Sequence, residues 1–413
     1  MLSQFVREAV MDQFNEAGHG LGIQDVGGGR LVLARPLAEE VQSAPMATTA
    51  ELVEEVRNGR MVVLVDAEDR ENEGDLIIPA QMATPDAINF MARYGRGLIC
   101  LAMTRNRATE LGLSEMVRSN QSRNRTAFTQ SIEARDGIST GISAHDRALT
   151  IATAIDPTKG ADAIVSPGHV FPLIARDGGV LIRAGHTEAS VDLARMAGLN
   201  PASVICEIMN DDGTMARLPD LRVFAHHHGL KIGTIEDMIA YRLRHDRIVT
   251  QVAETSVNST YGDDFRMHVY ETSVEPAEHI ALVKGDLSAS GPVLVRVHAT
   301  NVMTDLAGIG KDAECCLVEH SLRAISAEGR GVLVLIRDVR PRAVSEWLAD
   351  RDGPKEKISD EQRKSRQVEI GVGSQILADL GVEDMILLTN SPQHNYVGLE
   401  AFGLRITKTR KIG

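Results

Sequence analysis

The chain has 413 residues, 43% hydrophobic and 24% charged, so it is a globular protein too long for one ordinary core, and two domains are expected. Its formal net charge of −13 argues against nucleic acid as a main partner, because a phosphate backbone requires a basic face. No apolar run approaches the roughly 20 residues that span a bilayer. Four cysteines, two of them adjacent, make no disulfide framework and indicate a reducing, cytoplasmic compartment.

Four regions follow one another along the chain. Residues 1–46 contain the flexible VGGGR segment and are expected to form a poorly ordered N-terminal extension, with an oligomer contact as the alternative. Residues 47–248 mix helical and strand patterns without a clean βαβ repeat. Residues 249–266 are rich in Ser, Thr and Asp and are predicted to be a linker, and residues 267–413 form a second folded region. The predicted class is therefore α+β with two domains, a mixed α/β domain followed by an α+β domain.

Local patterns predict several elements in chain order. TTAELVEEVRNGR has an N-cap at Thr48 and apolar residues at helical spacing, and MVVLVD follows as a buried strand. Thr84-Pro85 opens a second helix, and GLICLAM is another strand. VLIRAG is predicted to be a strand that leads to a helix capped by Thr187. In the second region we expect the strands HIALVKG, VLVRVHA, VLVLIRD and MILLTN, and the helix SQILADLG with a glycine C-cap.

The first segment that indicates chemistry is DAEDRENEGDLI, which begins at Asp66. It holds one base, Arg70, and six acids: Asp66, Glu68, Asp69, Glu71, Glu73 and Asp75. The cluster lies between an apolar strand and the apolar LII, so the repulsion among its carboxylates must be compensated. Mg²⁺ or Mn²⁺ compensates it through one or two carboxylates together with substrate oxygens. An acidic surface loop is the alternative interpretation.

The second segment is RAGHTEAS, which begins at Arg183. A helix N-terminus with an arginine beside it suits an anion such as phosphate. His186 stands at this junction, where a histidine is either a capping or core residue or a metal ligand.

Three further segments carry polar groups in special settings. His169 follows Pro-Gly in PGHVFPLIARDGG and is either an exposed acid or base or a turn histidine bonded to the backbone. Glu207 lies inside the apolar ICEIM, where a charge requires a partner or its pKa rises, unless it faces outward from an edge strand. GISTGISAHDRA offers hydroxyl and backbone donors that fit a phosphate, although a plain turn explains it equally well.

Taken together, DREN-EGDLI, TGISA-DRA, PGH, GHTEA and CEI resemble 3,4-dihydroxy-2-butanone 4-phosphate synthase, an enzyme of the riboflavin pathway, over roughly Thr48–Asp246. The resemblance implies conversion of the small-molecule substrate D-ribulose 5-phosphate to formate and L-3,4-dihydroxy-2-butanone 4-phosphate. It also implies dependence on Mg²⁺ and a homodimer with shared active sites.

The resemblance also implies roles for single residues. It makes Glu71 and His186 the metal ligands, and His169 and Glu207 the groups essential to catalysis. The substrate-binding residues that it implies are Arg70, Glu71, Asp75, Arg183, Gly185, His186 and Thr187.

The second region resembles a GTP cyclohydrolase II domain over about Gln251–Gly413, but it departs from that family where the chemistry lies. The three zinc thiolates are replaced by Asn301, Asp312 and Glu314, and the adjacent Cys315 and Cys316 do not reproduce their spacing. The aligned catalytic arginine is Val368 and the aligned acidic proton acceptor is Arg366. The glycine-rich loop of the family is replaced by DVRPRAVSEW.

We therefore expect a second domain that keeps its fold, binds no zinc and does not hydrolyse GTP. Two alternatives remain open. One is a bifunctional enzyme in which Asp312, Glu314 and a cysteine bind a metal in a new way. The other is a non-catalytic module for dimerisation or regulation.

Overall fold

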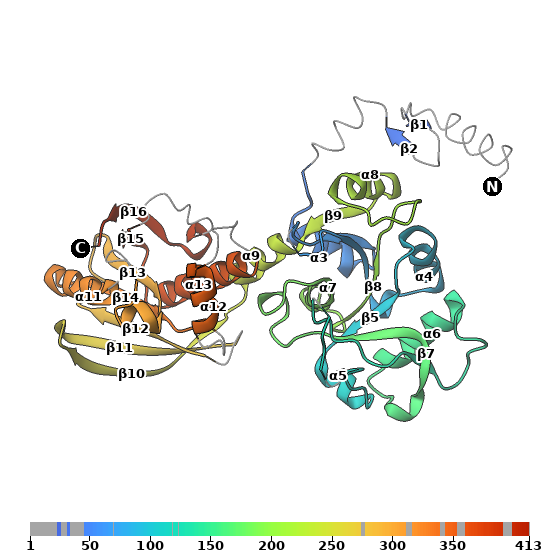
Figure 1. Ribbon diagram of the computed structural model, residues 1–413, viewed down its shortest axis with the longest axis horizontal. Coiled ribbons are helices and arrows are strands. Elements are labelled where there is room, and N and C mark those ends of the chain that lie inside the picture. Colours follow the sequence, from blue (N-terminus) through green and yellow to red (C-terminus); the bar gives the residue numbers. More distant parts are fainter. Residues whose placement is uncertain are drawn as a thin grey trace. The chain divides into compact units, whose positions relative to one another are not determined.

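A computed structural model describes residues 23–25, 31–33, 45–68, 70–117, 119–122, 124–273, 277–310, 316–338, 343–352, 360–390 and 399–412. The chain divides into two compact units, Met1–Ala175 with Gly185–Ile235, and Arg176–Ala184 with Glu236–Gly413. Each unit combines helices with one large sheet (Figure 1). The predicted α+β class with two domains is confirmed. None of the helices in the described ranges is both long and apolar enough to cross a membrane.

The first unit is built on a mixed seven-stranded sheet, in the described residues, of order β6-β7-β5-β8-β4-β3-β9. The central strand β8 runs antiparallel to both of its neighbours, β5 and β4. Strand β4 is buried on both faces, which explains its continuous apolar run after Asp75. The strands are β3 (Val62–Val65), β4 (Gly74–Pro79), β5 (Cys100–Met103), β6 (Ile132–Ala134), β7 (Ile164–Ile174), β8 (Ala202–Glu207) and β9 (Lys231–Thr234).

Helices cover both faces of this sheet. The helical segments are α3 (Thr49–Arg57), η1 (Ala80–Met82), α4 (Pro85–Phe90), the π-helix η2 (Met91–Gly95), α5 (Arg105–Glu110), α6 (Ala144–Ile155), η3 (Ala161–Ala163), α7 (His186–Met196) and α8 (Leu218–His228). Leu76 and Cys206 face the main core together with Ile88 of α4, Ile151 of α6 and Leu221 of α8. Because side chains alternate along a strand, Asp75 and Glu207 point to the opposite face, where α7 packs on β4 and β8.

Local sequence determines where the first helices begin. Thr48 caps α3 through a capping box with Glu51, as predicted, and Asn58 ends the helix. Thr84 accepts a hydrogen bond from Ala87 and Pro85 occupies the first turn of α4, also as predicted.

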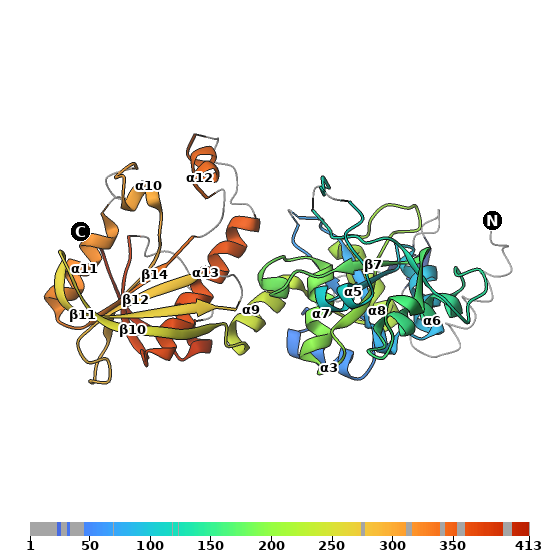
Figure 2. The same ribbon diagram turned by 90° about the horizontal axis from the view of Figure 1, so that it is seen from below.

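The second unit contains a sheet of order β10-β11-β12-β14-β13-β15-β16. Figure 2 labels β10, β11, β12 and β14 of this sheet. Its strands are β10 (Val249–Ser259), β11 (Gly262–Thr272), β12 (Glu278–Lys284), β13 (Val293–Ala299), β14 (Gly331–Ile336), β15 (Asp384–Leu388) and β16 (Arg405–Arg410). Its helical segments are η4 (Gly179–Leu181), most of α9 (Ile235–His245), α10 (Val302–Asp305), α11 (Leu317–Glu328), α12 (Ala343–Asp352), α13 (Asp360–Asp379) and η5 (Leu399–Phe402). Ile325 of α11 packs with Leu294, whereas Gly373 of α13 lies against Val297 on the other face, so these helices enclose the sheet.

Three expectations from the sequence are wrong. Residues 249–266 are not a linker, because β10 and β11 form an antiparallel hairpin there. Residues 180–185 are not a strand, since Gly178 and Gly179 both have positive φ and the chain turns through η4. Thr187 does not cap α7, which begins at His186 with Gly185 as its N-cap.

Most of the predicted N-terminal extension lies outside the described residues. Only the short strands β1 (Ile23–Asp25) and β2 (Leu31–Leu33) are described, and they pair antiparallel.

The hairpin generates a prediction about stability. Phe265 is 1% exposed and lies in the core of the second unit, so removing it with β10 deletes a large apolar contact worth about 3–5 kcal/mol. A fragment of residues 236–413 is expected to unfold cooperatively on heating. A fragment of residues 267–413 is expected to melt at a much lower temperature or without a transition, as followed by circular dichroism. Equal melting temperatures for the two fragments would show that residues 249–266 are dispensable, as a linker is.

Candidate active site

The turn between β3 and β4 is organised by the carboxylate of Asp66, whose side chain is fully buried. Its Oδ2 accepts from Arg70 Nη1 at 2.7 Å and from the backbone N–H of Glu71 at 3.2 Å. Its Oδ1 accepts from the N–H of Glu73 at 2.9 Å. Both oxygens of Asp66 are therefore used to fold the turn, and Glu71 is displayed at its tip.

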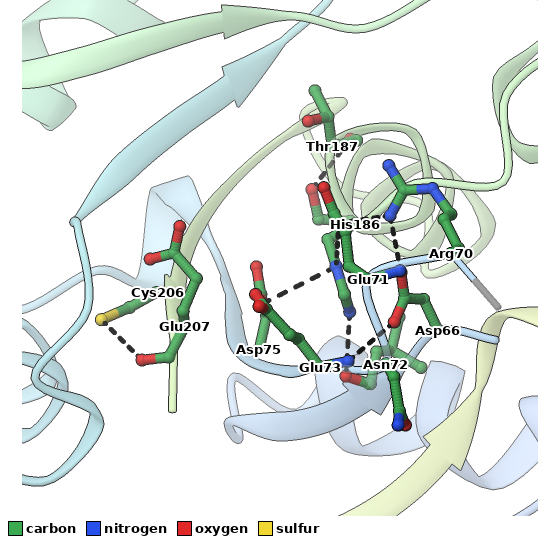
Figure 3. A network of polar contacts seen from close by, with 12 residues as sticks. Asp66, Arg70, Glu71, Asn72, Glu73, Asp75, His186, Thr187, Cys206 and Glu207 are labelled. Carbon is green, nitrogen blue, oxygen red and sulfur yellow. Dashed lines mark hydrogen bonds and ion pairs between the residues drawn. The ribbon is translucent and has the colours of Figure 1, made fainter. Parts of the chain in front are cut away.

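Glu71 and His186 face each other in the interior of the first unit (Figure 3). The Nε2–H of His186 donates to the carbonyl of Leu64 at 3.2 Å, so the lone pair of the neutral ring lies on Nδ1. That Nδ1 lies 3.8 Å from Glu71 Oε2 and 3.7 Å from Asp75 Oδ1. The backbone of β3 thus selects which ring nitrogen is turned toward the carboxylates.

Two more carboxylates come from adjacent strands of the sheet. Asp75 on β4 and Glu207 on β8 are directly paired residues, so their side chains stand side by side on one face. Asp75 is 3% exposed and its Oδ1 has no hydrogen-bond partner. Glu207 Oε2 accepts from the N–H of Leu98 at 2.8 Å. Glu207 lies on an inner strand, so the interpretation as an edge-strand residue is wrong.

The charges of this cluster are tightly coupled. Burial alone would raise the pKa of Glu71, but His186 and Arg70 outweigh it and lower that pKa to about 2. Burial raises the pKa of Asp75 to about 7, because the attraction of His186 does not offset desolvation and the neighbouring carboxylates. Burial would lower the pKa of His186, but Asp75 and Glu71 raise it to about 9. The buried carboxylates therefore require a positive charge close to His186 Nδ1, which the imidazolium proton supplies in the absence of a cation.

A divalent cation fits this requirement. Ligand atoms of Asp66, Glu71 and His186 lie within 4.8 Å of one another, in the one such group found in the described residues. Carboxylate oxygens and an imidazole nitrogen are ligands that Mg²⁺ and Mn²⁺ accept. The unpartnered Oδ1 of Asp75 adds an acceptor for a hydroxyl group of a ligand bound beside the cation. The cluster is therefore a possible metal site.

Four more of the predicted substrate-binding residues are neighbours of Glu71 or His186 along the chain. Gly185 and Thr187 flank His186 at the start of α7 and are buried, and Arg183 lies in the turn before them, half-buried. Arg70 forms ion pairs with Asp66 and Glu71. Through these ion pairs, Arg70 links Asp66, which folds the turn, to Glu71 at its tip.

His169 is not joined to this cluster. It lies on β7, and within the described residues its ring hydrogen-bonds Glu133 of β6. Its side chain is 44% exposed, so the expectation of an exposed histidine is correct, although the residue belongs to a strand and not to a turn.

Sequence reasoning missed several residues that shape the site. Asn124 Nδ2 donates to Glu71 Oε1 at 2.6 Å, and Arg217 Nη1 donates to the Glu71 carbonyl at 2.8 Å. A pocket of about 530 Å³ opens beside Glu71 and is lined in part by Asn124, Leu98, Met116, Phe128 and Phe171. These contacts join segments far apart in the sequence, so no local sequence pattern predicts them.

In the second unit, the positions aligned with zinc thiolates are only partly described. Asn301 Oδ1 accepts from the N–H groups of Met303 and Thr304, so this side chain caps α10. His298 Nε2 bonds Asp305 Oδ2 at 2.9 Å beside it. Asp312, Glu314, Cys315 and the side chain of Arg366 lie outside the described residues, and Val368 lies on α13.

Comparison with known proteins first gives the class. The family model of 3,4-dihydroxy-2-butanone 4-phosphate synthase matches residues 50–241, and that of GTP cyclohydrolase II matches residues 250–411. The structure is similar to that of a two-domain 3,4-dihydroxy-2-butanone 4-phosphate synthase named RibBX from A. baumannii, with a TM-score of 0.74, 40% identity and coverage of 89% of this chain and 99% of that one. The fold is thus that of a two-domain 3,4-dihydroxy-2-butanone 4-phosphate synthase.

Sequence relatives define the family more closely. A 3,4-dihydroxy-2-butanone 4-phosphate synthase of Photobacterium phosphoreum is 46% identical, over 88% of this chain and 98% of its own length. The riboflavin biosynthesis protein RibBA of Aquifex aeolicus is 47% identical, over 87% of this chain and 91% of its own length. The chain belongs to the 3,4-dihydroxy-2-butanone 4-phosphate synthase family, and its enzyme activity is the conversion of D-ribulose 5-phosphate to formate and L-3,4-dihydroxy-2-butanone 4-phosphate. The resemblance inferred from the motifs is confirmed.

The geometry of the cluster generates a prediction about metal. Glu71→Gln and His186→Ala each remove a candidate ligand, so each is expected to weaken Mg²⁺ binding by about tenfold or more in calorimetric titrations. Glu68→Gln removes an exposed acid from the same turn and serves as the matched control, with unchanged affinity. EDTA is expected to abolish formate release and Mg²⁺ to restore it. Full turnover after complete removal of metal would contradict the assignment.

Proposed function

We propose that the acidic cluster of the first unit is the centre of the synthase reaction, with Glu71 and His186 as the metal ligands and Mg²⁺ or Mn²⁺ as the ion. One observation carries this proposal: Glu71 Oε2 and Asp75 Oδ1 both lie within 4 Å of the buried Nδ1 of His186. Asp66 is close enough to ligate, but both of its oxygens already hold the turn. The ion would stabilise negative charge that develops on the carbonyl and hydroxyl oxygens of the sugar.

The side chains around this centre divide the remaining work. Asp75 presents an unpartnered oxygen toward the site and is proposed to accept a substrate hydroxyl. Arg70 and Arg183 supply positive charge for substrate binding, and the N-terminus of α7 at Gly185 and Thr187 offers backbone N–H groups to the phosphate. Substrate binding is thereby assigned to Arg70, Glu71, Asp75, Arg183, Gly185, His186 and Thr187.

Glu207 and His169 are proposed to be the catalytic proton-transfer groups. The reaction begins with removal of a proton next to a carbonyl, and its later loss of water and release of formate also require proton transfer. Glu207 is held by Leu98 N–H on one oxygen and retains the other for this task. His169 exposes its ring and has Glu133 as its partner within the chain.

Within the described residues His169 pairs with Glu133 and not with the acidic cluster, and this supports a homodimer with shared sites. A half-exposed catalytic histidine can serve a site on a second copy of the chain. Apolar side chains lie exposed near the pocket, with Leu98 at 41%, Met116 at 51% and Val117 at 50%. Such side chains are suited to burial at an interface between subunits.

We further propose that the second unit does not hydrolyse GTP. Asn301, at a position where the cyclohydrolase family has a zinc thiolate, spends its side chain on capping α10. Val368, aligned with the catalytic arginine, cannot bind phosphate. The relative from Photobacterium phosphoreum aligns over 88% of this chain and is named only as a synthase. A metal site built from Asp312, Glu314 and a cysteine remains the rival, since two carboxylates make a site better suited to Mg²⁺ than to zinc.

A reducing, cytoplasmic location is proposed on cysteine usage. Cys100, Cys206 and Cys316 are free, and Cys100 and Cys206 are buried in the first unit. Burial raises the pKa of Cys206 well above its usual range, so this thiol is inert and acts as a small apolar residue.

A kinetic comparison tests the division of labour between binding and catalysis. Arg183→Ala removes a charge-assisted contact worth about 1.5–3 kcal/mol, so KM for ribulose 5-phosphate is expected to rise about 10- to 150-fold with little change in kcat. Glu207→Gln removes a proton-transfer group, so kcat is expected to fall about 10²- to 10⁴-fold. Steady-state measurement of formate release separates the two effects. The same kinetic defect in both variants would show that the roles are assigned wrongly.

A second test concerns the C-terminal domain of the full chain. The purified protein is expected to release no formate from GTP above a control without enzyme, and to hold no stoichiometric zinc by elemental analysis. Formate release from GTP together with about one zinc per chain would move the protein into the bifunctional class. Formate from ribulose 5-phosphate, measured in the same preparation, shows that the first unit is active, and cooperative thermal unfolding of the fragment of residues 236–413 shows that the second unit is folded.

A further inference from the structure

Strand β7 departs from regular pairing just where it carries His169. Ile132 of β6 pairs with Val170, whereas the next residue, Glu133, pairs with Val165. Residues 166–169 therefore stand outside the ladder as a bulge, a device that redirects side chains next to functional sites. The backbone of this bulge is fixed, because the N–H of Gly168 donates to Ser131 Oγ at 3.1 Å.

The close approach of β6 and the bulge places one acid beside His169. A Cβ at position 168 would lie 2.2 Å from the backbone of Ile132, so only glycine allows the two segments to come this near. Glu133 Oε1 then hydrogen-bonds His169 Nδ1. A carboxylate can only accept, so Nδ1 carries the proton and the lone pair of the neutral imidazole lies on Nε2.

A loop closes over the same pair. Gly141 has φ +85°, and a Cβ there would overlap Glu133 Oε1 and lie 2.7 Å from His169 Nδ1. Asp146 holds this loop, because its Oδ2 accepts from the Gly141 N–H at 3.0 Å and from Ser139 Oγ at 2.8 Å. The Nδ1 edge of the ring is thus enclosed by protein, while 44% of the His169 side chain remains exposed.

We propose, resting on the catalytic role assigned above to His169, that Glu133 is a positioning residue for the synthase reaction: it holds the proton on His169 Nδ1 and directs the Nε2 lone pair outward to the substrate. When Nε2 takes a proton from the substrate, the ring becomes an imidazolium with a proton on each nitrogen, and Glu133 remains ionised beside it. The substrate keeps the electron pair of the broken bond, so charge and protons balance. The arrangement follows the general pattern of a base oriented by a second polar group.

The test uses the full chain with Mg²⁺ and ribulose 5-phosphate. Glu133→Gln keeps the size of the side chain but offers an amide that can donate to Nδ1, so kcat is expected to fall about 10- to 100-fold while KM changes less than about twofold. Glu133→Asp keeps the carboxylate and is expected to retain more kcat than Glu133→Gln. Asp136→Asn removes an exposed acid three residues along the chain and serves as the matched control with unchanged kcat.

Two readouts separate positioning from a merely structural role. Nitrogen NMR of ¹⁵N-histidine-labelled protein, assigned by comparison with His169→Ala, is expected to show the proton on Nδ1 in the natural chain and on Nε2 in Glu133→Gln. In a double-mutant cycle, Glu133→Gln is expected to lower kcat no further once His169 is alanine.

The outcomes distinguish this inference from the proposed function. Loss of activity in His169→Ala, with normal kcat and an unchanged tautomer in Glu133→Gln, would overturn the role of Glu133 and leave that of His169 intact. Additive losses in the double variant would likewise overturn it. Full activity in His169→Ala would refute the catalytic role of His169 and the inference with it. If Glu133→Gln does not fold, Glu133→Asp decides the matter, since its tautomer must match that of the natural chain.

Discussion

Buried carboxylates that face one another cannot all remain ionised without a nearby positive charge, and this constraint governs the first unit. Asp75 and Glu207 stand side by side because β4 and β8 are in register, and Glu71 is added to them by a turn that Asp66 folds. His186 stands among them with one nitrogen tied to β3. The fold therefore gathers these acids at one point, through the sheet, the turn and the start of α7. A cation is favoured at that point.

The sequence predicts best what depends on neighbours along the chain. The capping box at Thr48, the proline-led helix at Pro85 and the acidic composition of the turn are all local features, and the motifs of the family follow one another in order. The β10–β11 hairpin escaped prediction because residues 250–256 are exposed on both faces, so the strand lacks the alternation that a half-buried strand shows. For that reason the sequence pattern of residues 249–266 resembles that of a linker.

Long-range pairing decided the parts of the site that local patterns do not contain. Leu98 supplies an N–H to Glu207, and Asn124 holds Glu71, across large separations in sequence. The geometry at His169 depends on which residue of β6 meets which residue of β7, and a register of this kind follows from three-dimensional packing. Motifs in the sequence thus name the residues of the candidate site, whereas the groups that orient them are seen only in the folded structure.

The cap at Asn301 limits which residues this position can hold without loss of stability. An N-cap side chain contributes about 1 kcal/mol to a helix, so a change from Asn301 to cysteine would weaken the start of α10 before any metal could be held. A thiolate binds zinc usefully only when its companions are present as well. Asn301 therefore stabilises the start of α10 in a way that does not depend on any ligand of the second unit.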